Sequence, residues 1–177
     1  MIHKPEAKEF PESYRYYVEL VKGDDGLMAM EEQLMLFRRL IAEVSTDQES
    51  FAYAAGKWSV KELVGHVCDT ERIFAYRALC IARGEGNQLP GFDENNYVSK
   101  GKFNQRSLND LMHEFSLLRE SNVALFRSFD KDMLSRRGMA NNYLVSVRAI
   151  LFMMLGHELH HQEVLRSRYL PLMVPAL

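Results

Sequence analysis

The segment WSVKELVGHVCDTERIFAYRALCIA, residues 58–82, contains the clearest helix signal in the chain. Its residues Ser59-Val60-Lys61-Glu62 form a capping box, in which the Ser59 hydroxyl accepts from the Glu62 amide and the Glu62 carboxylate reaches back. A long helix is therefore predicted from about Val60 to Ala82, ending near Arg83-Gly84.

Apolar residues recur at helical spacing in four further stretches. They predict a short helix within 12–21 and long helices over about 27–44, 107–126 and 146–169, joined in part by a connection at 46–57. No sequence signal for a strand hairpin competes with these helices. The sequence therefore predicts an all-α fold, a four-helix bundle with a short N-terminal helix.

The segment 84–106, which joins the second and third long helices, is longer than the roughly 2–8 residues usual between helices of a bundle. Such a crossover can run the length of the bundle and let the two helices point the same way. Long loops often carry function, but a solvated connection without chemistry fits the same length.

Composition and charge exclude several classes of protein. The 177 residues suffice for one domain with a substantial core, so a single domain over 1–177 is expected. The formal net charge of -2 gives no indication of binding to nucleic acid or to an anionic membrane surface. The longest uncharged apolar stretch, 149–156, is far too short to span a membrane.

Cys68 and Cys80 are predicted to lie in one helix, with Cα atoms roughly 18 Å apart. This separation is too large for a disulfide. The N-terminus also lacks the apolar core of a signal peptide. Together these features indicate a reducing compartment, and a cytoplasmic protein is expected.

Three of the six histidines lie in His157-Glu158-Leu159-His160-His161. At about 100° per residue, His157 and His161 fall within about 20° of the centre of the apolar face that contains Ile150, whereas His160 falls near its edge. Two imidazoles one turn apart can hold one metal ion. His66 projects from the core-facing side of its own helix and is the third candidate ligand. A lone histidine on such a face is usually a hydrogen-bonded core residue, but three inward histidines favour a metal site.

The same residues also satisfy H-E-x-x-H, the pattern of zinc proteases in which Glu158 would be the general base. That fold requires a third ligand downstream. The remaining sixteen residues contain no histidine or aspartate, and Glu163 is too close on the same helix to close the site. The chain also lacks the strand signals of such a protease. The protease interpretation therefore fails, and the third ligand must come from upstream.

The stretches KWSVKELVGH (57–66), DTERIFAYRAL (69–79), LPGFDEN (89–95) and GHELHH (156–161) resemble the DinB-like superfamily. Within it, the chain is most similar to the bacillithiol S-transferase branch, whose members are also described as metal-dependent hydrolases. The resemblance extends over nearly the whole chain, from about Pro5 onward.

This resemblance implies a bundle of up-down-down-up order, which agrees with the long crossover. It also implies a homodimer and a divalent metal ion held by three histidines, which here fall on His66, His157 and His161. In the family, the ion keeps open positions that water fills. Three histidines suit several metals, and zinc or nickel is expected here.

Three hypotheses for function follow. The first is a metal-dependent S-transferase that conjugates a low-molecular-weight, bacillithiol-like thiol to a small electrophilic substrate. The second is a metal-dependent hydrolase that uses a metal-bound water. The third is a non-enzymatic metal-binding stress protein.

Further residues are candidates for catalysis or substrate binding. Glu158 and Asp69 are candidate general bases, although both residue types are more often solvated or structural. Arg77 shares the helix face of His66 and is a candidate for binding an anionic substrate, with a buried ion pair as the alternative. Candidates for substrate contacts in the crossover are Asp93, Glu94 and Tyr97.

Overall fold

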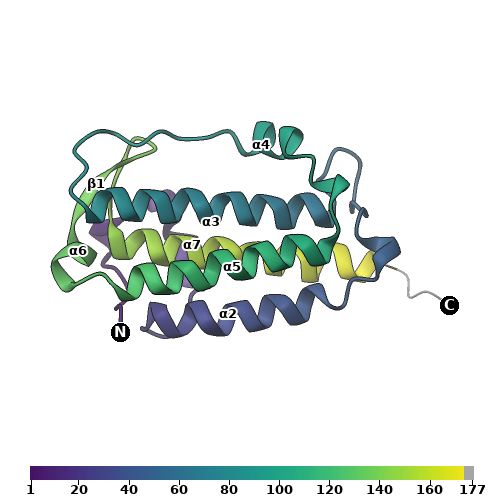
Figure 1. The fold of residues 1–177 in the computed structure, drawn as a ribbon, viewed down its shortest axis with the longest axis horizontal. Helices are drawn as coiled ribbons and strands as arrows, with labels where there is room; N and C mark the ends of the chain where they lie inside the picture. The colour runs from purple at the N-terminus through teal and green to yellow at the C-terminus, as the bar shows by residue number, and fades with distance from the viewer. Residues whose placement is uncertain (174–177) are drawn as a thin grey trace.

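The computed structural model describes residues 1–173, and the last four residues of the expected domain lie outside this range. Four long helices form a bundle, as predicted (Figure 1). They are α2 (Gly26–Ile41), α3 (Val60–Ala82), α5 (Leu108–Arg127) and α7 (Val147–Val164). The shorter elements are α1 (Arg15–Leu20), α4 (Glu94–Gly101), α6 (Lys131–Ser135), β1 (Arg137–Ala140) and β2 (Tyr143–Ser146).

The helices α2 and α7 run in one direction and α3 and α5 in the other, which confirms the up-down-down-up order (Figure 1). Around the bundle, α2 packs against α5, α5 against α3, α3 against α7, and α7 against α2. The long crossover returns along the outside of the bundle from the end of α3 to the start of α5 (Figure 1). None of the helices within residues 1–173 is long and apolar enough to cross a membrane.

The predicted capping box is present at the start of α3. The Ser59 hydroxyl accepts from the Glu62 amide at 3.1 Å, and the Glu62 carboxylate accepts from the Ser59 amide at 2.8 Å. The hydroxyls of Ser107 and Ser146 cap α5 and α7 in the same way. These caps satisfy backbone donors that the first turn of a helix leaves free, so they fix where each helix begins.

The prediction that the chain contains no hairpin was wrong, because β1 and β2 pair as a short antiparallel hairpin. Its turn residues Asn141 and Asn142 have φ values of 50° and 66°, the left-handed region that asparagine tolerates in hairpin turns. The crossover, expected as a loop, contains α4. The predicted last helix continues from α7 as a π-helix over Leu165–Tyr169.

Within the described residues, the buried apolar side chains form two clusters, one of which includes Phe74 and Phe126 and the other Val67 and Phe115. Buried polar side chains lie between them on all four long helices. They are Gln33, His66, Thr70, Glu71, Ser116, Arg119, Asn122, His157, Glu158, His161 and Gln162. A polar layer therefore divides the core of the bundle.

Arg119 is fully buried at the centre of this layer. Its guanidinium donates to both carboxylate oxygens of Glu71 on α3, at 2.8 and 3.1 Å, and to Glu158 on α7 at 2.6 Å. It also donates to the backbone carbonyl of Met30 on α2 at 3.2 Å. One side chain on α5 thus bonds to each of the other three long helices.

Burial disfavours the charged form of Arg119, but Glu158 and Glu71 outweigh it and raise the pKa of the guanidinium above its ordinary value. Burial raises the pKa of Glu158, although Arg119 and Gln162 oppose this shift. The cation is therefore held permanently charged between its two carboxylates.

Replacing Arg119 by Met should lower the free energy of unfolding by about 3–5 kcal/mol, because two buried carboxylates lose their cation. The matched control is Arg127→Met, which removes an exposed ion pair with Glu31 and should cost no more than about 1 kcal/mol. Urea unfolding of both variants checks this. Equal stability of the two variants would contradict the role given to Arg119.

Gly156 on α7 allows the close approach of α1, because an added Cβ would overlap the backbone carbonyl of Tyr17. Gly156→Ala should destabilise the protein by roughly 1–3 kcal/mol, since this clash outweighs the helix propensity of about 1 kcal/mol that alanine adds. The control is Gly86→Ala, whose Cβ would meet no atom. Thermal unfolding of the two variants should differ clearly, and a more stable Gly156→Ala would refute the packing argument.

Candidate metal centre

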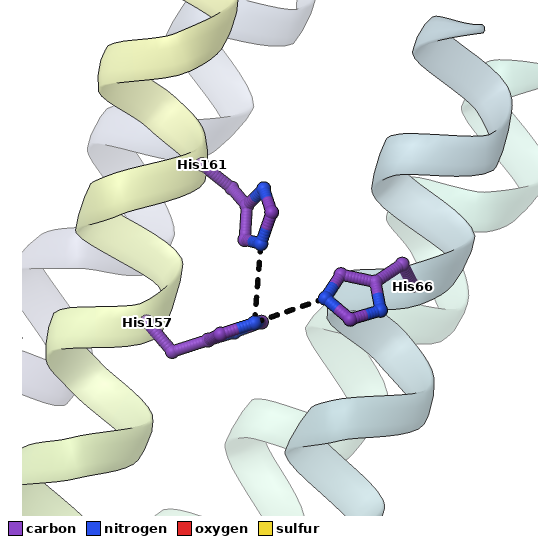
Figure 2. Close-up of side chains that lie close together, drawn as sticks. All are labelled: His66, His157 and His161. Atoms are coloured by element: carbon purple, nitrogen blue, oxygen red, sulfur yellow. Dashed lines mark hydrogen bonds between the residues drawn. The ribbon is translucent and has the colours of Figure 1, made fainter. Parts of the chain in front are cut away.

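Three imidazoles converge between α3 and α7 (Figure 2). His66 comes from α3, and His157 and His161 come from successive turns of α7. The Nε2 atom of His157 lies 3.0 Å from Nε2 of His66 and 3.1 Å from Nε2 of His161. All three side chains are buried, so the structure brings together the three histidines that were predicted as ligands.

Aromatic rings hold these imidazoles in place. The ring of Trp58 lies 4.7 Å from that of His66, centroid to centroid, and stacks on His161 at 6.4 Å. Tyr17 meets His157 edge-on at 5.8 Å. The orientation of the three rings is therefore set by packing as well as by the helices.

All three imidazoles are neutral at pH 7. Burial lowers the pKa of His66 to about 4. Burial, followed by the proximity of the other imidazoles, lowers the pKa values of His157 and His161 well below the ordinary value. A neutral imidazole presents a free lone pair, which is the form that binds a metal ion.

The hydrogen-bonding pattern fits a shared cation better than a set of hydrogen bonds. Nε2 of His157 lies within hydrogen-bond distance of Nε2 of both other histidines. A ring nitrogen of a neutral imidazole carries either one N–H or one lone pair, so Nε2 of His157 cannot form a normal hydrogen bond to both. With a cation at the centre, all three Nε2 lone pairs are used.

The spacing of the three nitrogens also fits. Zinc–nitrogen bonds of about 2.0–2.1 Å at tetrahedral angles place ligand nitrogens roughly 3.4 Å apart. The two Nε2 separations of 3.0 and 3.1 Å are slightly shorter than this. All three nitrogens lie within 4.8 Å of one another, so small shifts of the rings suffice to admit an ion. Three protein ligands leave at least one position for another molecule.

A cavity of about 460 Å³ opens beside the three histidines. Its volume is within the range of small-molecule sites. Apart from α3 and α7, its wall is built by segments outside the four long helices. These segments contribute Ser13, Tyr14, Tyr17, Trp58, Phe92, Glu94, Asn141 and Tyr143.

Neither candidate general base lines this cavity. Glu158 bonds to Arg119 and Gln162 inside the bundle. Asp69 is half-buried and faces Arg72, which also pairs with Glu114 of α5. Glu158 directly follows the predicted ligand His157, but adjacent residues on a helix point in different directions.

Of the four candidate substrate-binding residues, two line the cavity and two do not. Arg77 and Glu94 line the cavity. Asp93 instead caps α4 by accepting from the Asn96 amide, and Tyr97 is exposed and packs on Phe92. The alternative of a buried ion pair for Arg77 was wrong, because within residues 1–173 it pairs with no carboxylate and donates to the carbonyl of Pro90.

Several cavity residues were not predicted. Asn141 and Tyr143 reach the site from the hairpin, and the Asn141-Asn142 pair is the signal that could have revealed it. Tyr14 and Tyr17 come from the N-terminal helices, where nothing in the sequence indicates a role in the site. His160, predicted at the edge of the apolar face, is half-buried and also lines the cavity.

The sequence profile of the DinB superfamily matches residues 29–165, which include all three histidines. The chain belongs to the DinB superfamily. This confirms the resemblance to the superfamily found in the sequence. A comparison with curated proteins found no match.

Solved structures share this fold at low sequence identity. YfiT from Bacillus subtilis, described as a probable metal-dependent hydrolase with an unusual four-helix bundle topology, has a TM-score of 0.71 at 16% identity, covering 93% of each chain. The mycothiol-dependent maleylpyruvate isomerase has a TM-score of 0.65 at 14% identity, covering 78% of this chain and 58% of the other. The DinB-like protein YjoA, also from Bacillus subtilis, has a TM-score of 0.55 at 22% identity, covering 80% and 86%.

If the three histidines hold one ion, the purified chain should bind one equivalent of zinc or nickel. Replacing any of His66, His157 or His161 by Ala should lower the affinity by at least about tenfold, because a ligand is lost. His113→Ala is the control, since His113 lies outside the cluster. Competition with a chromogenic chelator measures the affinity. Unchanged binding in all three variants would show that the ion, if any, binds elsewhere.

Proposed function

We propose that this DinB-superfamily protein is a metal-dependent S-transferase, which joins a low-molecular-weight thiol to a small electrophilic substrate. The observation that carries this proposal is the chemistry of the cavity. Three neutral imidazoles meet at one end of it, and its only carboxylate among the described residues is the exposed Glu94. A divalent ion held there would lower the pKa of a coordinated thiol and keep it as a thiolate.

The chain contributes orientation and exclusion of water. His66, His157 and His161 present their Nε2 atoms to one point, where the reactive end of the thiol would be placed. Phe74 and Tyr17 pack against His157 and bring apolar surface next to that point. A thiolate in such surroundings is poorly hydrated and therefore a stronger nucleophile. Because the ion would hold the thiol as a thiolate, the reaction would require no general base from the cavity wall.

The mycothiol-dependent isomerase supports thiol chemistry on this fold, and YfiT supports a hydrolase as the second candidate. For hydrolysis, the cavity offers His160 as a base. Burial, with a smaller effect of Arg168, lowers the pKa of His160, so this imidazole is neutral and can accept a proton. The family resemblance also supports a homodimer, and the cysteine and N-terminal features of the sequence favour the cytoplasm.

The transferase proposal predicts a metal-dependent reaction between a thiol and monobromobimane. The expected product contains a new sulfur–carbon bond, with bromide released and the thiol proton passed to solvent. Zinc- or nickel-reconstituted protein should accelerate this reaction with at least one of bacillithiol, mycothiol, glutathione and cysteine. His66→Ala, His157→Ala and His161→Ala should each abolish the acceleration, whereas His113→Ala should retain it. Fluorescence of the bimane adduct measures the rate.

The three hypotheses give different results in this experiment. Hydrolysis of an ester and amide panel without added thiol would favour the hydrolase, and His160→Ala should then reduce the rate. A metal-loaded protein that is inert in both assays would favour a non-enzymatic role. Activity that survives all three ligand substitutions would refute both enzyme hypotheses.

A further inference from the structure

Arg77 is a buried cation in the cavity wall without a matching anion. Its side chain is only 5% exposed. One Nη2–H group donates to the backbone carbonyl of Pro90 at 2.8 Å, and no carboxylate within the described chain forms an ion pair with it. A guanidinium has five N–H groups, so most of its donors remain available to a molecule in the cavity.

Arg119, the other buried arginine, shows how carboxylates balance a buried guanidinium in this bundle. Arg119 has two carboxylates, Glu71 and Glu158, and its pKa is raised accordingly. Arg77 has none, and burial lowers its pKa even though Tyr14 partly opposes the shift. A buried charge without a partner is costly, and is expected where a ligand supplies the opposite charge.

The surroundings of Arg77 are otherwise uncharged. Tyr14, Phe74, Asn141 and Tyr143 line both this cavity and a small neighbouring pocket together with Arg77. Glu94 lines the same cavity, but it is exposed at the start of α4 and forms no ion pair with Arg77. One unpaired cation without a nearby lysine matches a singly charged group better than a phosphate dianion.

A row of side chains on α3 connects Arg77 to the three histidines. His66, Thr70, Phe74 and Arg77 all line the cavity, and their helix rises roughly 16 Å from the first to the last. The Phe74 ring lies 6.3 Å from that of His157, and Arg77 Cζ lies 5.9 Å from the Phe74 centroid. The histidines and the guanidinium therefore lie at two ends of one continuous wall.

Thr70 adds a second unpaired group to this wall. Its hydroxyl is buried one turn from His66 and has no hydrogen-bond partner among the described residues. A threonine in a helix can return its hydroxyl to the carbonyl four residues earlier, but this hydroxyl does not. It is available to a polar group of a molecule that passes along α3.

We propose that the cavity binds an elongated small-molecule carboxylate, with its carboxylate on Arg77, its middle along Phe74 and Thr70, and its reactive end at the three histidines. The reactive end rests on the proposed function, but the carboxylate site does not. The carboxylate belongs either to the thiol or to the electrophile, since both would enter this cavity.

The test measures binding without turnover. Trp58 is the only tryptophan in the chain and lines the cavity, so its fluorescence reports occupancy. Zinc-loaded protein is titrated with 6-mercaptohexanoate and with 6-mercaptohexan-1-ol, which differ only in the charged end. The acid should bind at least about tenfold more tightly, as expected for a charge-assisted hydrogen bond.

Variants locate the source of this preference. Arg77→Met should abolish the preference for the acid, and Arg77→Lys should restore part of it. Arg127→Met, which changes an exposed arginine, should leave the preference intact. A preference that persists in Arg77→Met would overturn the proposal, because the carboxylate would then be held by the ion or by another group. If Arg77→Met does not fold, equal affinity of the acid and the alcohol for the unmodified protein overturns it equally.

Two further probes distinguish the sources of the carboxylate. Hexanoate and hexan-1-ol carry no thiol and leave the ion free. If hexanoate shows the Arg77-dependent preference while 2-mercaptoethanol, a thiol without a carboxylate, is bound, the carboxylate belongs to the electrophile. If only the mercapto acid shows the preference, the carboxylate belongs to the thiol. A protein that shows the preference but no transferase activity would refute the proposed function alone.

Discussion

The bundle depends on the buried guanidinium of Arg119. Because it bonds to α2, α3 and α7 from its position on α5, it fixes all four long helices relative to one another. An apolar layer would tolerate a rotated or shifted helix, whereas a buried charge loses its partners when a helix turns. Glu158 is next to His157 in the sequence, so the bond that holds α7 to Arg119 also sets the direction in which His157 and His161 point. The candidate metal centre is thus built on one side of a charge network whose other side holds the bundle together.

Much of the fold could be predicted because its signals are local. The capping serines fix where α3, α5 and α7 begin, and helical periodicity placed His157 and His161 on the inward face. The partners of Arg119, Glu71 and Glu158, could not be predicted in this way. The sequence does not distinguish a polar side chain that faces water from one that faces another helix. The same limit applies to Glu158 and Asp69, which were candidate bases by sequence proximity alone. Which of them reaches the cavity depends on how α3 and α7 are rotated against their neighbours.

The sequence did not predict most of the cavity residues outside α3 and α7, for a different reason. Tyr14, Tyr17, Asn141 and Tyr143 come from short elements far apart in the sequence, and only the folded chain brings them to α3 and α7. The hairpin has a recognisable turn, but its strands of four residues each are too short to show a clear alternation. Arg77 is an intermediate case. Periodicity placed it on the correct face, but only the structure shows that it lacks the carboxylate partner expected of a buried arginine.

The cavity wall consists of two parts, one on the helices of the bundle and one on short segments. The three histidines and Arg77 lie on helices of the bundle, whereas most of the remaining wall comes from short segments outside the four long helices. Substitutions in the hairpin or the crossover can therefore reshape the cavity without removing the three histidines. The shape of the cavity can thus change independently of the buried wall on α3 and α7.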